Sequence, residues 1–190
     1  MLSKEQKRVI LQIAQDAVKE AVLNEKIINK EELLEKYPWL AQKGAVFVTL
    51  NEFNSLRGCI GSIIAHRSLL EDIIQNAKAA ALSDPRFKPV SKEELDNLDI
   101  EVSLLTEPKP LEYRDILDLK AKIKPGIDGV ILNYNGYQAT YLPSVWEQLP
   151  TFEAFFTSLC QKAGMSGNCL DYHPQIYTYE AIKIDKESVK

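Results

Sequence analysis

The chain has 190 residues, of which 45% are hydrophobic and 26% are charged, as in an ordinary soluble globular protein large enough for its own core. Its formal charge is −4, from 23 basic and 27 acidic residues, and no dense run of lysine or arginine occurs. This balance argues against nucleic-acid binding, because that binding draws its affinity from cations that neutralise phosphates.

Helix signals recur along the chain. Ser3 opens a capping box that predicts a helix of about 20 residues. Asn29 caps a short second helix and Ser68 caps a third. Thr151 begins a fourth helix, which Gly164 ends.

Strand signals lie between these helices. The segment GAVFVTL (44–50) predicts a strand, and LRGCIGS (56–62) is its return strand in a hairpin. LDIEVSLLTEP (98–108) alternates apolar and polar residues, GVILNYNGYQATYL (129–142) is a hairpin around Asn-Gly, and QIYTYEAIKI (175–184) is a last strand. Helices alternate with hairpins, so we predict an α+β fold with a largely antiparallel sheet flanked by helices.

LRGCIGS concentrates the most unusual chemistry in the chain. Alternation along a strand places Arg57, Cys59 and Gly61 on one face, with Leu56 and Ile60 facing the core. A cation as near as Arg57 favours the thiolate and lowers the pKa of the thiol from its usual value of about 8.5. The alternative is that Cys59 is a small buried packing residue.

The two glycines of this segment fit either interpretation. Gly58 and Gly61 weaken a strand, so each marks a bulge or a place where another group comes close. That group is either a ligand or a packed helix. We therefore include both glycines, with Arg57, among the candidate ligand-binding residues.

The cysteine pattern predicts free thiols. Cys59, Cys160 and Cys169 form neither an even framework nor a C-x-x-C pair, which is typical of a reducing compartment. A Cys160–Cys169 bridge is the alternative in an oxidising setting. No apolar run approaches the roughly 20 residues of a membrane span, and the first residues lack the apolar core of a signal peptide. We expect a cytoplasmic protein without a membrane partner.

The loop SDPRFKPV (83–90) places a carboxylate and a guanidinium two residues apart, between prolines that forbid regular structure. In one interpretation, Asp84 caps nearby backbone amides, as aspartate before proline often does. Alternatively, Arg86 presents its planar fork to a small anionic ligand.

The polar face of the 98–108 strand carries Glu101 and Ser103. If Arg57 and Cys59 share this face, a polar cluster results. Arg57 with Glu101 is then either a structural ion pair or part of a catalytic site.

Two ring-bearing residues are further candidates. Trp146, in LPSVWEQLP (142–150), is either a core or lobe-interface residue or an aromatic wall beside a ligand cleft. His66 follows LRGCIGS closely enough to leave a Cys–His pair with Cys59 open.

We predict no metal site and no cofactor. The only histidines, His66 and His173, have no second ligand at helix or loop spacing. Neither common phosphate-binding glycine motif occurs, and no G-x-S-x-G elbow occurs.

Several segments in register resemble the AMMECR domain family, called AmmeMemoRadiSam system protein A in prokaryotes. They are LRGCIGS, DPRF, LDIEVSLL, GVIL before a hairpin, and LPSVWEQLP followed by LCQKAG, and the match runs from about residue 5 to residue 184. The chain departs from the usual pattern at Ala139, where many members have glycine, and at Cys169–Leu170, near which a tryptophan is common.

The resemblance implies a single domain over residues 1–190, with a larger antiparallel-sheet lobe and a smaller lobe that the sequence does not delimit. It implies that the LRGCIG strand lies near a groove between them. It also implies a Memo-type protein and a radical SAM protein as partners, and it implies no reaction.

Two functions follow. The first is a binding or adaptor module with a ligand- or partner-binding groove around LRGCIG, which is preferred because no complete catalytic constellation occurs. The alternative is a thiol-dependent enzyme that uses Cys59 as nucleophile or acid/base on a small anionic substrate. Arg57 would then hold the thiolate or the anion, and Glu101 or His66 would move protons.

Overall fold

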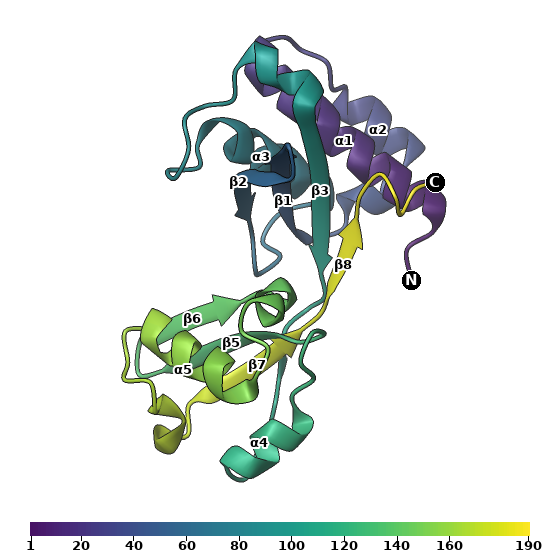
Figure 1. Ribbon diagram of the computed structural model, residues 1–190. Helices are drawn as coiled ribbons and strands as arrows, with labels where there is room; N and C mark the ends of the chain where they lie inside the picture. The colour runs from purple at the N-terminus through teal and green to yellow at the C-terminus, as the bar shows by residue number, and fades with distance from the viewer. The chain divides into compact units, whose positions relative to one another are not determined.

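Two four-stranded sheets, each with its own hydrophobic core, organise the computed structural model, which describes residues 1–190 (Figure 1). The first unit comprises Met1–Leu105 and Ile182–Lys190, and the second comprises Thr106–Ala181. The predicted α+β class with antiparallel pairing is confirmed, although the strands form two sheets where the sequence predicted one. No helix has both the length and the apolar character that crossing a membrane requires.

The sheet of the first unit has the strand order β2-β1-β3-β8. Its strands are β1 (Ala45–Glu52), β2 (Ser55–Gly61), β3 (Leu98–Leu105) and β8 (Ala181–Ile184). β1 pairs antiparallel with both β2 and β3, so the predicted LRGCIGS hairpin is confirmed and β2 lies at the sheet edge.

Helices cover one face of this sheet. They are α1 (Lys4–Leu23) and α3 (Leu69–Leu82), which pack on each other and on the strands, whereas α2 (Lys30–Lys36) packs mainly on the 3-10 helix that follows it (Figure 1). The predicted caps at Ser3, Asn29 and Ser68 are confirmed, because each side chain accepts a hydrogen bond from the first helical turn. The helices bury their apolar faces against strand residues, and each fully buried isoleucine or leucine contributes about 1.5–3 kcal/mol.

The second unit has its own sheet, in the order β4-β7-β5-β6. Its elements are β4 (Lys109–Pro110), α4 (Ile116–Lys122), β5 (Gly129–Tyr134), β6 (Tyr137–Tyr141), α5 (Phe152–Lys162) and β7 (Gln175–Tyr179). The predicted Asn-Gly hairpin is confirmed: Asn135 and Gly136 join β5 to β6 with φ values of 46° and 87°, the left-handed backbone that a tight hairpin turn requires. Short 3-10 helices occur in both units, at Pro38–Ala41, Lys92–Asn97, Pro143–Glu147 and Cys169–Tyr172.

Trp146 is a core residue of the second unit. Its indole is only 4% exposed and stacks on Phe155 with ring centroids 3.8 Å apart. Its Nε1–H donates a hydrogen bond of 2.8 Å to the carbonyl oxygen of Asp128. The interpretation of Trp146 as the wall of a ligand cleft is therefore wrong, because its ring is enclosed by the unit's own side chains.

Two elements differ from the sequence prediction. QIYTYEAIKI is not one strand: it divides at Glu180 into β7 and β8, which belong to different sheets. The Glu180 backbone bonds instead to Thr106, with its N–H donating to Thr106 Oγ1 and its carbonyl accepting from Thr106 N–H, both at 2.8 Å. Helix α4 was not predicted, although Asp115, whose side chain accepts from Asp118 N–H at 2.8 Å, is an ordinary capping signal.

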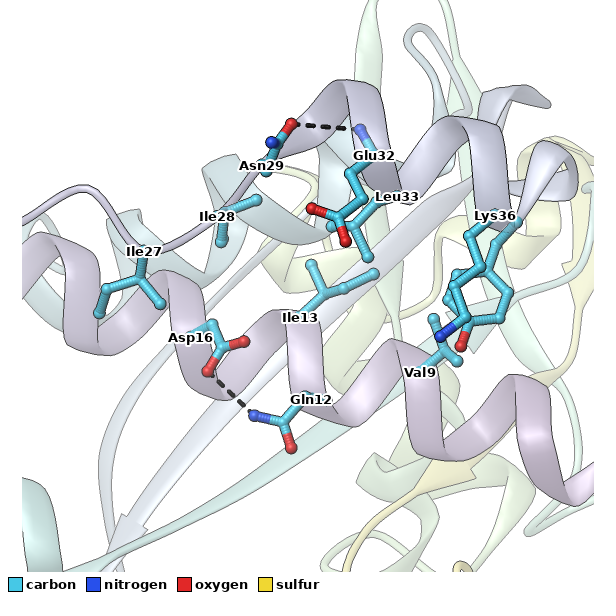
Figure 2. Close-up of a pocket in the computed structure, with 11 residues that line it drawn as sticks. Val9, Gln12, Ile13, Asp16, Ile27, Ile28, Asn29, Glu32, Leu33 and Lys36 are labelled. Atoms are coloured by element: carbon cyan, nitrogen blue, oxygen red, sulfur yellow. Dashed lines mark hydrogen bonds between the residues drawn. The ribbon is translucent and has the colours of Figure 1, made fainter.

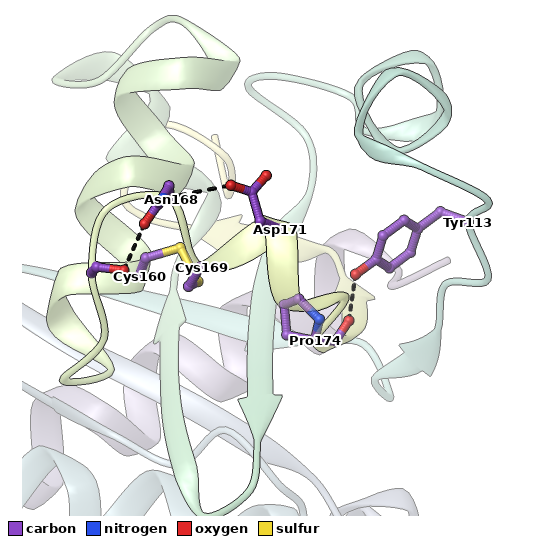
Figure 3. Close-up of a disulfide and its surroundings, with 7 residues drawn as sticks. Tyr113, Cys160, Asn168, Cys169, Asp171 and Pro174 are labelled. Carbon is purple, nitrogen blue, oxygen red and sulfur yellow. Dashed lines mark hydrogen bonds between the residues drawn. A yellow bond between two sulfur atoms is a disulfide. The ribbon is translucent and has the colours of Figure 1, made fainter.

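The second unit contains a disulfide between Cys160 of α5 and Cys169 (Figure 3). The prediction of three free thiols is therefore wrong for this pair, and the bridge that was left as the alternative is present. Cys59 is the one free cysteine. The pairing depends on the fold, which brings the two Cα atoms within 5.7 Å across a separation of nine residues.

Candidate functional site

The face of the first sheet opposite the helices carries the candidate site. Cys59 in β2 lies opposite Thr49 in β1, and Thr49 lies opposite Glu101 in β3. The next row places Phe47 between Gly61 and Ser103. The sequence expectation that Cys59, Glu101 and Ser103 share one face is therefore confirmed.

The Cys59 thiol is half-buried, and its surroundings raise its pKa. Its Sγ lies 3.3 Å from Thr49 Oγ1. Burial raises the pKa of the thiol, and the carboxylates of Asp84 and Glu101 raise it further, whereas the Thr49 hydrogen bond and the Arg86 charge oppose the shift. The predicted lowering of this pKa by Arg57 is wrong, because desolvation of the thiolate dominates.

An irregularity in the strand pairing places the Arg57 guanidinium beside Glu94. Leu50 pairs with Gly58 but Asn51 pairs with Leu56, so Arg57 is the extra residue of a bulge. Its guanidinium forms a bidentate pair with Glu94, with Nε–Oε2 at 2.7 Å and Nη2–Oε1 at 3.1 Å.

The predicted pairing of Arg57 with Glu101 is therefore wrong. Glu101 Oε2 lies instead 3.4 Å from Lys183 Nζ, on β8. Because a bulge re-aims the side chain of its extra residue, simple alternation failed at Arg57 and held at Cys59. The guanidinium of Arg57 is bound by a carboxylate of the protein itself.

The two glycines of LRGCIG accommodate close protein neighbours. A Cβ atom at Gly58 would overlap the carbonyl oxygen of Ala80 in α3. A Cβ atom at Gly61 would overlap the ring of Phe47 in β1. Of the two interpretations left open, the packed helix explains Gly58, and a neighbouring side chain explains Gly61.

Asp84 joins the DPRF loop to the edge of β2. Its side chain is 2% exposed and accepts hydrogen bonds from the backbone N–H of Cys59 at 2.9 Å and of Arg86 at 3.0 Å. Arg86 also donates to it through Nη2 at 2.8 Å and Nε at 3.0 Å. The Arg86 guanidinium holds the pKa of the Asp84 carboxyl well below its usual range.

The interpretation of Asp84 as a cap of local amides is confirmed, and the structure adds a distant partner. Asp84 does cap a local amide, but it also caps Cys59, 25 residues away in the chain. Arg86 does not present a free fork to an anion, because Asp84 takes its Nε and one Nη. The result is a clasp, Asp84 with Arg86, that occupies the outer edge of β2 beside the thiol.

His66 takes no part in this cluster. It is exposed, and its Nδ1 lies 3.2 Å from the carbonyl oxygen of Ile64. It is not among the groups that interact with Cys59, so the Cys–His pair is not formed. No group of three or more His, Cys, Asp or Glu side chains is arranged to hold a metal ion.

Comparisons with known proteins identify the family of the chain. The AMMECR1 family model matches residues 11–184. The chain belongs to the AMMECR1 family. A protein of Methanothermobacter thermautotrophicus is 36% identical over 95% of this chain and 94% of its own length, and one of Thermococcus gammatolerans is 38% identical over 94% and 89%. The crystal structure of the uncharacterized protein PH0010 from Pyrococcus horikoshii superposes with a TM-score of 0.85 at 35% identity, covering 96% of this chain and 92% of that one.

Sequence reasoning missed a buried polar network beside the family motif. Asp72 of α3 is fully buried and accepts from the Val46 backbone N–H at 2.8 Å, Ser62 Oγ at 2.8 Å and Arg67 Nε at 2.7 Å. Asn76, one turn later, donates to the carbonyl oxygen of Val46 at 3.0 Å. The available signal was two polar residues spaced i and i+4 on the apolar face of a helix. The network ties the start of β1 and the residue after β2 to α3.

Cavities lie elsewhere in each unit. One of about 300 Å³ lies between α1 and residues 27–37, and Ile13, Asp16 and Glu32 are among the residues that line it (Figure 2). None of its lining residues belongs to LRGCIG, DPRF or β3. A second, of about 280 Å³, is lined in the other unit by residues 110–113 and 173–177. The sequence predicted neither.

The raised pKa of Cys59 predicts slow alkylation. Iodoacetamide should modify one thiol per native chain, more slowly at pH 7 than a cysteine peptide, and with a midpoint above the about 8.5 of an exposed thiol. Replacement of Glu101 by glutamine should lower the midpoint, and replacement of Thr49 by valine should raise it. Peptide mass analysis across pH measures all three, and a midpoint below that of the peptide would contradict the assignment.

Proposed function

We propose that this AMMECR1-family chain is a binding or adaptor module that acts with a Memo-type protein and a radical SAM protein. The surface concerned is the exposed sheet face around LRGCIG, with Cys59, Thr49 and Glu101. One observation carries the proposal: the only free thiol, Cys59, is half-buried, burial raises its pKa, and its charged neighbours include two carboxylates but no histidine. Such a thiol is a poor nucleophile, since the thiolate is the reactive form. The choice of partners rests on the family resemblance.

The hairpin that carries this motif supplies a second argument for binding. Phe53, at the turn between β1 and β2, is 75% exposed and has a φ of 51°. A bulky residue is rarely found at positive φ, where asparagine or glycine is favoured. An exposed aromatic ring at a strained turn is costly for stability alone, and aromatic rings of this kind serve as anchors in protein interfaces.

The test is co-purification of the tagged chain from a host that contains both partner proteins, with quantification by mass spectrometry. We expect the unmodified chain and Cys59→Ser to recover both proteins equally. Phe53→Asn should recover at least about tenfold less, as for loss of an interface anchor. Because asparagine tolerates positive φ, this variant should fold at least as stably as the original, and a thermal melt checks that control. Recovery of neither protein by the unmodified chain would contradict the proposal.

The alternative, a thiol-dependent enzyme acting on a small anionic substrate, makes the opposite prediction for Cys59. It is favoured by the partial exposure of Cys59 and by Arg86, the cation that acts on its thiol. In a strain that lacks the gene and shows a phenotype, Cys59→Ser should restore growth fully if the chain is a binding module. Loss of rescue by a stable Cys59→Ser protein would favour the enzyme.

We also propose a cytoplasmic setting, in which a disulfide such as Cys160–Cys169 is typically transient or redox-sensing. Radical SAM proteins depend on an iron–sulfur cluster held by cysteine thiolates, which a reducing compartment preserves. Fractionation of the host followed by immunodetection tests this, and recovery in an oxidising compartment would contradict it.

A further inference from the structure

The disulfide links two elements of the second unit that also share its hydrophobic core. Cys160 lies in α5 and Cys169 begins the 3-10 helix Cys169–Tyr172, and both side chains are fully buried. The side-chain hydrogen bonds of the connecting loop are local and exposed, from Ser166 Oγ to Asn168 at 2.6 Å and from Asn168 to Asp171 at 3.5 Å (Figure 3). The covalent bond therefore acts together with Leu170, which is buried in the unit's core, and with Tyr172, whose ring centroid lies 5.8 Å from that of Tyr134, to fix where this 3-10 helix lies.

The residues that directly follow the 3-10 helix line a cavity. Its C-cap is His173, whose backbone has the left-handed φ of 52° and whose N–H donates to the carbonyl oxygen of Leu170 at 3.1 Å. The imidazole stacks on Tyr113 with ring centroids 4.2 Å apart. Tyr113 in turn donates its hydroxyl hydrogen bond to the carbonyl oxygen of Pro174 (Figure 3). Tyr113, His173 and Pro174 all line the cavity of about 280 Å³.

We propose that the Cys160–Cys169 disulfide is a redox-sensitive link that sets the shape of this cavity. A left-handed non-glycine residue persists only where its surroundings hold it. Cys169 of the disulfide lies four residues before His173. Once the bond is reduced, the 3-10 helix is free to move, His173 leaves the left-handed region, and its stack on Tyr113 is lost. This inference concerns the second unit and does not depend on the function proposed for the Cys59 face.

The chemical step is thiol–disulfide exchange with a dithiol reductant. A thiolate of the dithiol attacks one sulfur and forms a mixed disulfide, and its second thiol then releases the protein. Two electrons and two protons pass to the protein, which gains two thiols, while the dithiol becomes a disulfide. Both protein sulfurs are buried, so exchange requires local opening of the loop.

The test uses the full chain with Cys59→Ser, which removes the third thiol and prevents scrambling. The two histidines and two tryptophans make NMR assignment direct. We expect dithiothreitol to shift the ring signals of His173 and to speed exchange of its amide by at least about tenfold. The signals of His66, in the other unit, should not change. Addition of Cys169→Ala should produce the same His173 shift without reductant.

Three outcomes would overturn the proposal. The first is that the His173 ring signals and amide exchange stay unchanged after two new thiols have been titrated. The bond would then stabilise the unit without controlling the cavity. The second is loss of the Trp146 indole N–H signal on reduction, which would mean that the whole unit unfolds. The third is a chain that retains two free thiols under air oxidation.

Discussion

Replacement of Gly58 by alanine should destabilise the first unit by about 3 kcal/mol, near the upper end for overpacking a well-packed site. The added Cβ atom would overlap the Ala80 carbonyl oxygen, which belongs to the backbone of α3 and has no rotamer through which to escape. The helix must therefore move away from β1 and β2. Urea denaturation followed by the fluorescence of Trp39, which packs against this core, measures the change.

Gly61→Ala is the matched control in the same strand. Its Cβ atom would overlap the ring of Phe47, a half-buried side chain that can rotate away. We expect a smaller loss than for Gly58→Ala, about 1–2 kcal/mol, because Phe47 must change its rotamer but no backbone has to move, and part of the loss is offset because alanine restricts the unfolded chain more than glycine does. Equal effects of the two substitutions would show that the approach of α3 is not what requires Gly58.

Replacement of Asp84 by alanine should cost about 2–4 kcal/mol, the range for removing a buried charged acceptor. It leaves the Cys59 amide without its partner and Arg86 without its counter-ion, at the exposed edge of β2. The control is Asp99→Ala, because the Asp99–Lys186 pair is exposed and such pairs contribute about 0–1 kcal/mol. If Asp84→Ala lowered the free energy of unfolding no more than Asp99→Ala does, the clasp of Asp84 with Arg86 would not hold β2.

The same clasp predicts the sign of a pH effect. The pKa of Asp84 is lower in the folded protein than the about 3.9 of the unfolded chain, so its contribution is fully present above that pH and is lost as the pH falls below it. The stability difference between the original chain and Asp84→Ala should be constant between about pH 7 and pH 5 and narrow below about pH 4. The Arg57 hydrogen bond lowers the pKa of Glu94 to about 2, so Glu94 also loses its stabilising contribution on acidification. This loss occurs in both proteins and therefore cancels in their difference. A gap that widens on acidification would contradict this account.

Local structure was readable from the sequence because its causes are local. The caps at Ser3 and Ser68 and the turn at Asn135–Gly136 each depend on residues within three or four positions, and all three were predicted correctly. The strand alternation that places Cys59, Glu101 and Ser103 on one face is local too, once three strands pair. The family assignment rested on motif order, which needs no tertiary information.

The chemistry of the site was decided by contacts between distant residues. Asp84 reaches Cys59 across 25 positions, and Arg57 reaches Glu94 across 37. The bulge at Arg57 could not be foreseen, because it depends on register with β1 and interrupts the alternation from which the pairing with Glu101 was inferred.

By itself, the sequence determined the α+β class, most helices and strands, the family and the region of interest. Only the tertiary structure decided the direction in which the pKa of Cys59 shifts, the pairing of Cys160 with Cys169, the burial of Trp146 and the division of the last strand between two sheets. The reason is physical: hydrogen bonds within a turn and periodicity along an element are properties of a short segment. Desolvation, charge interactions and cross-links depend on which segments the fold brings together.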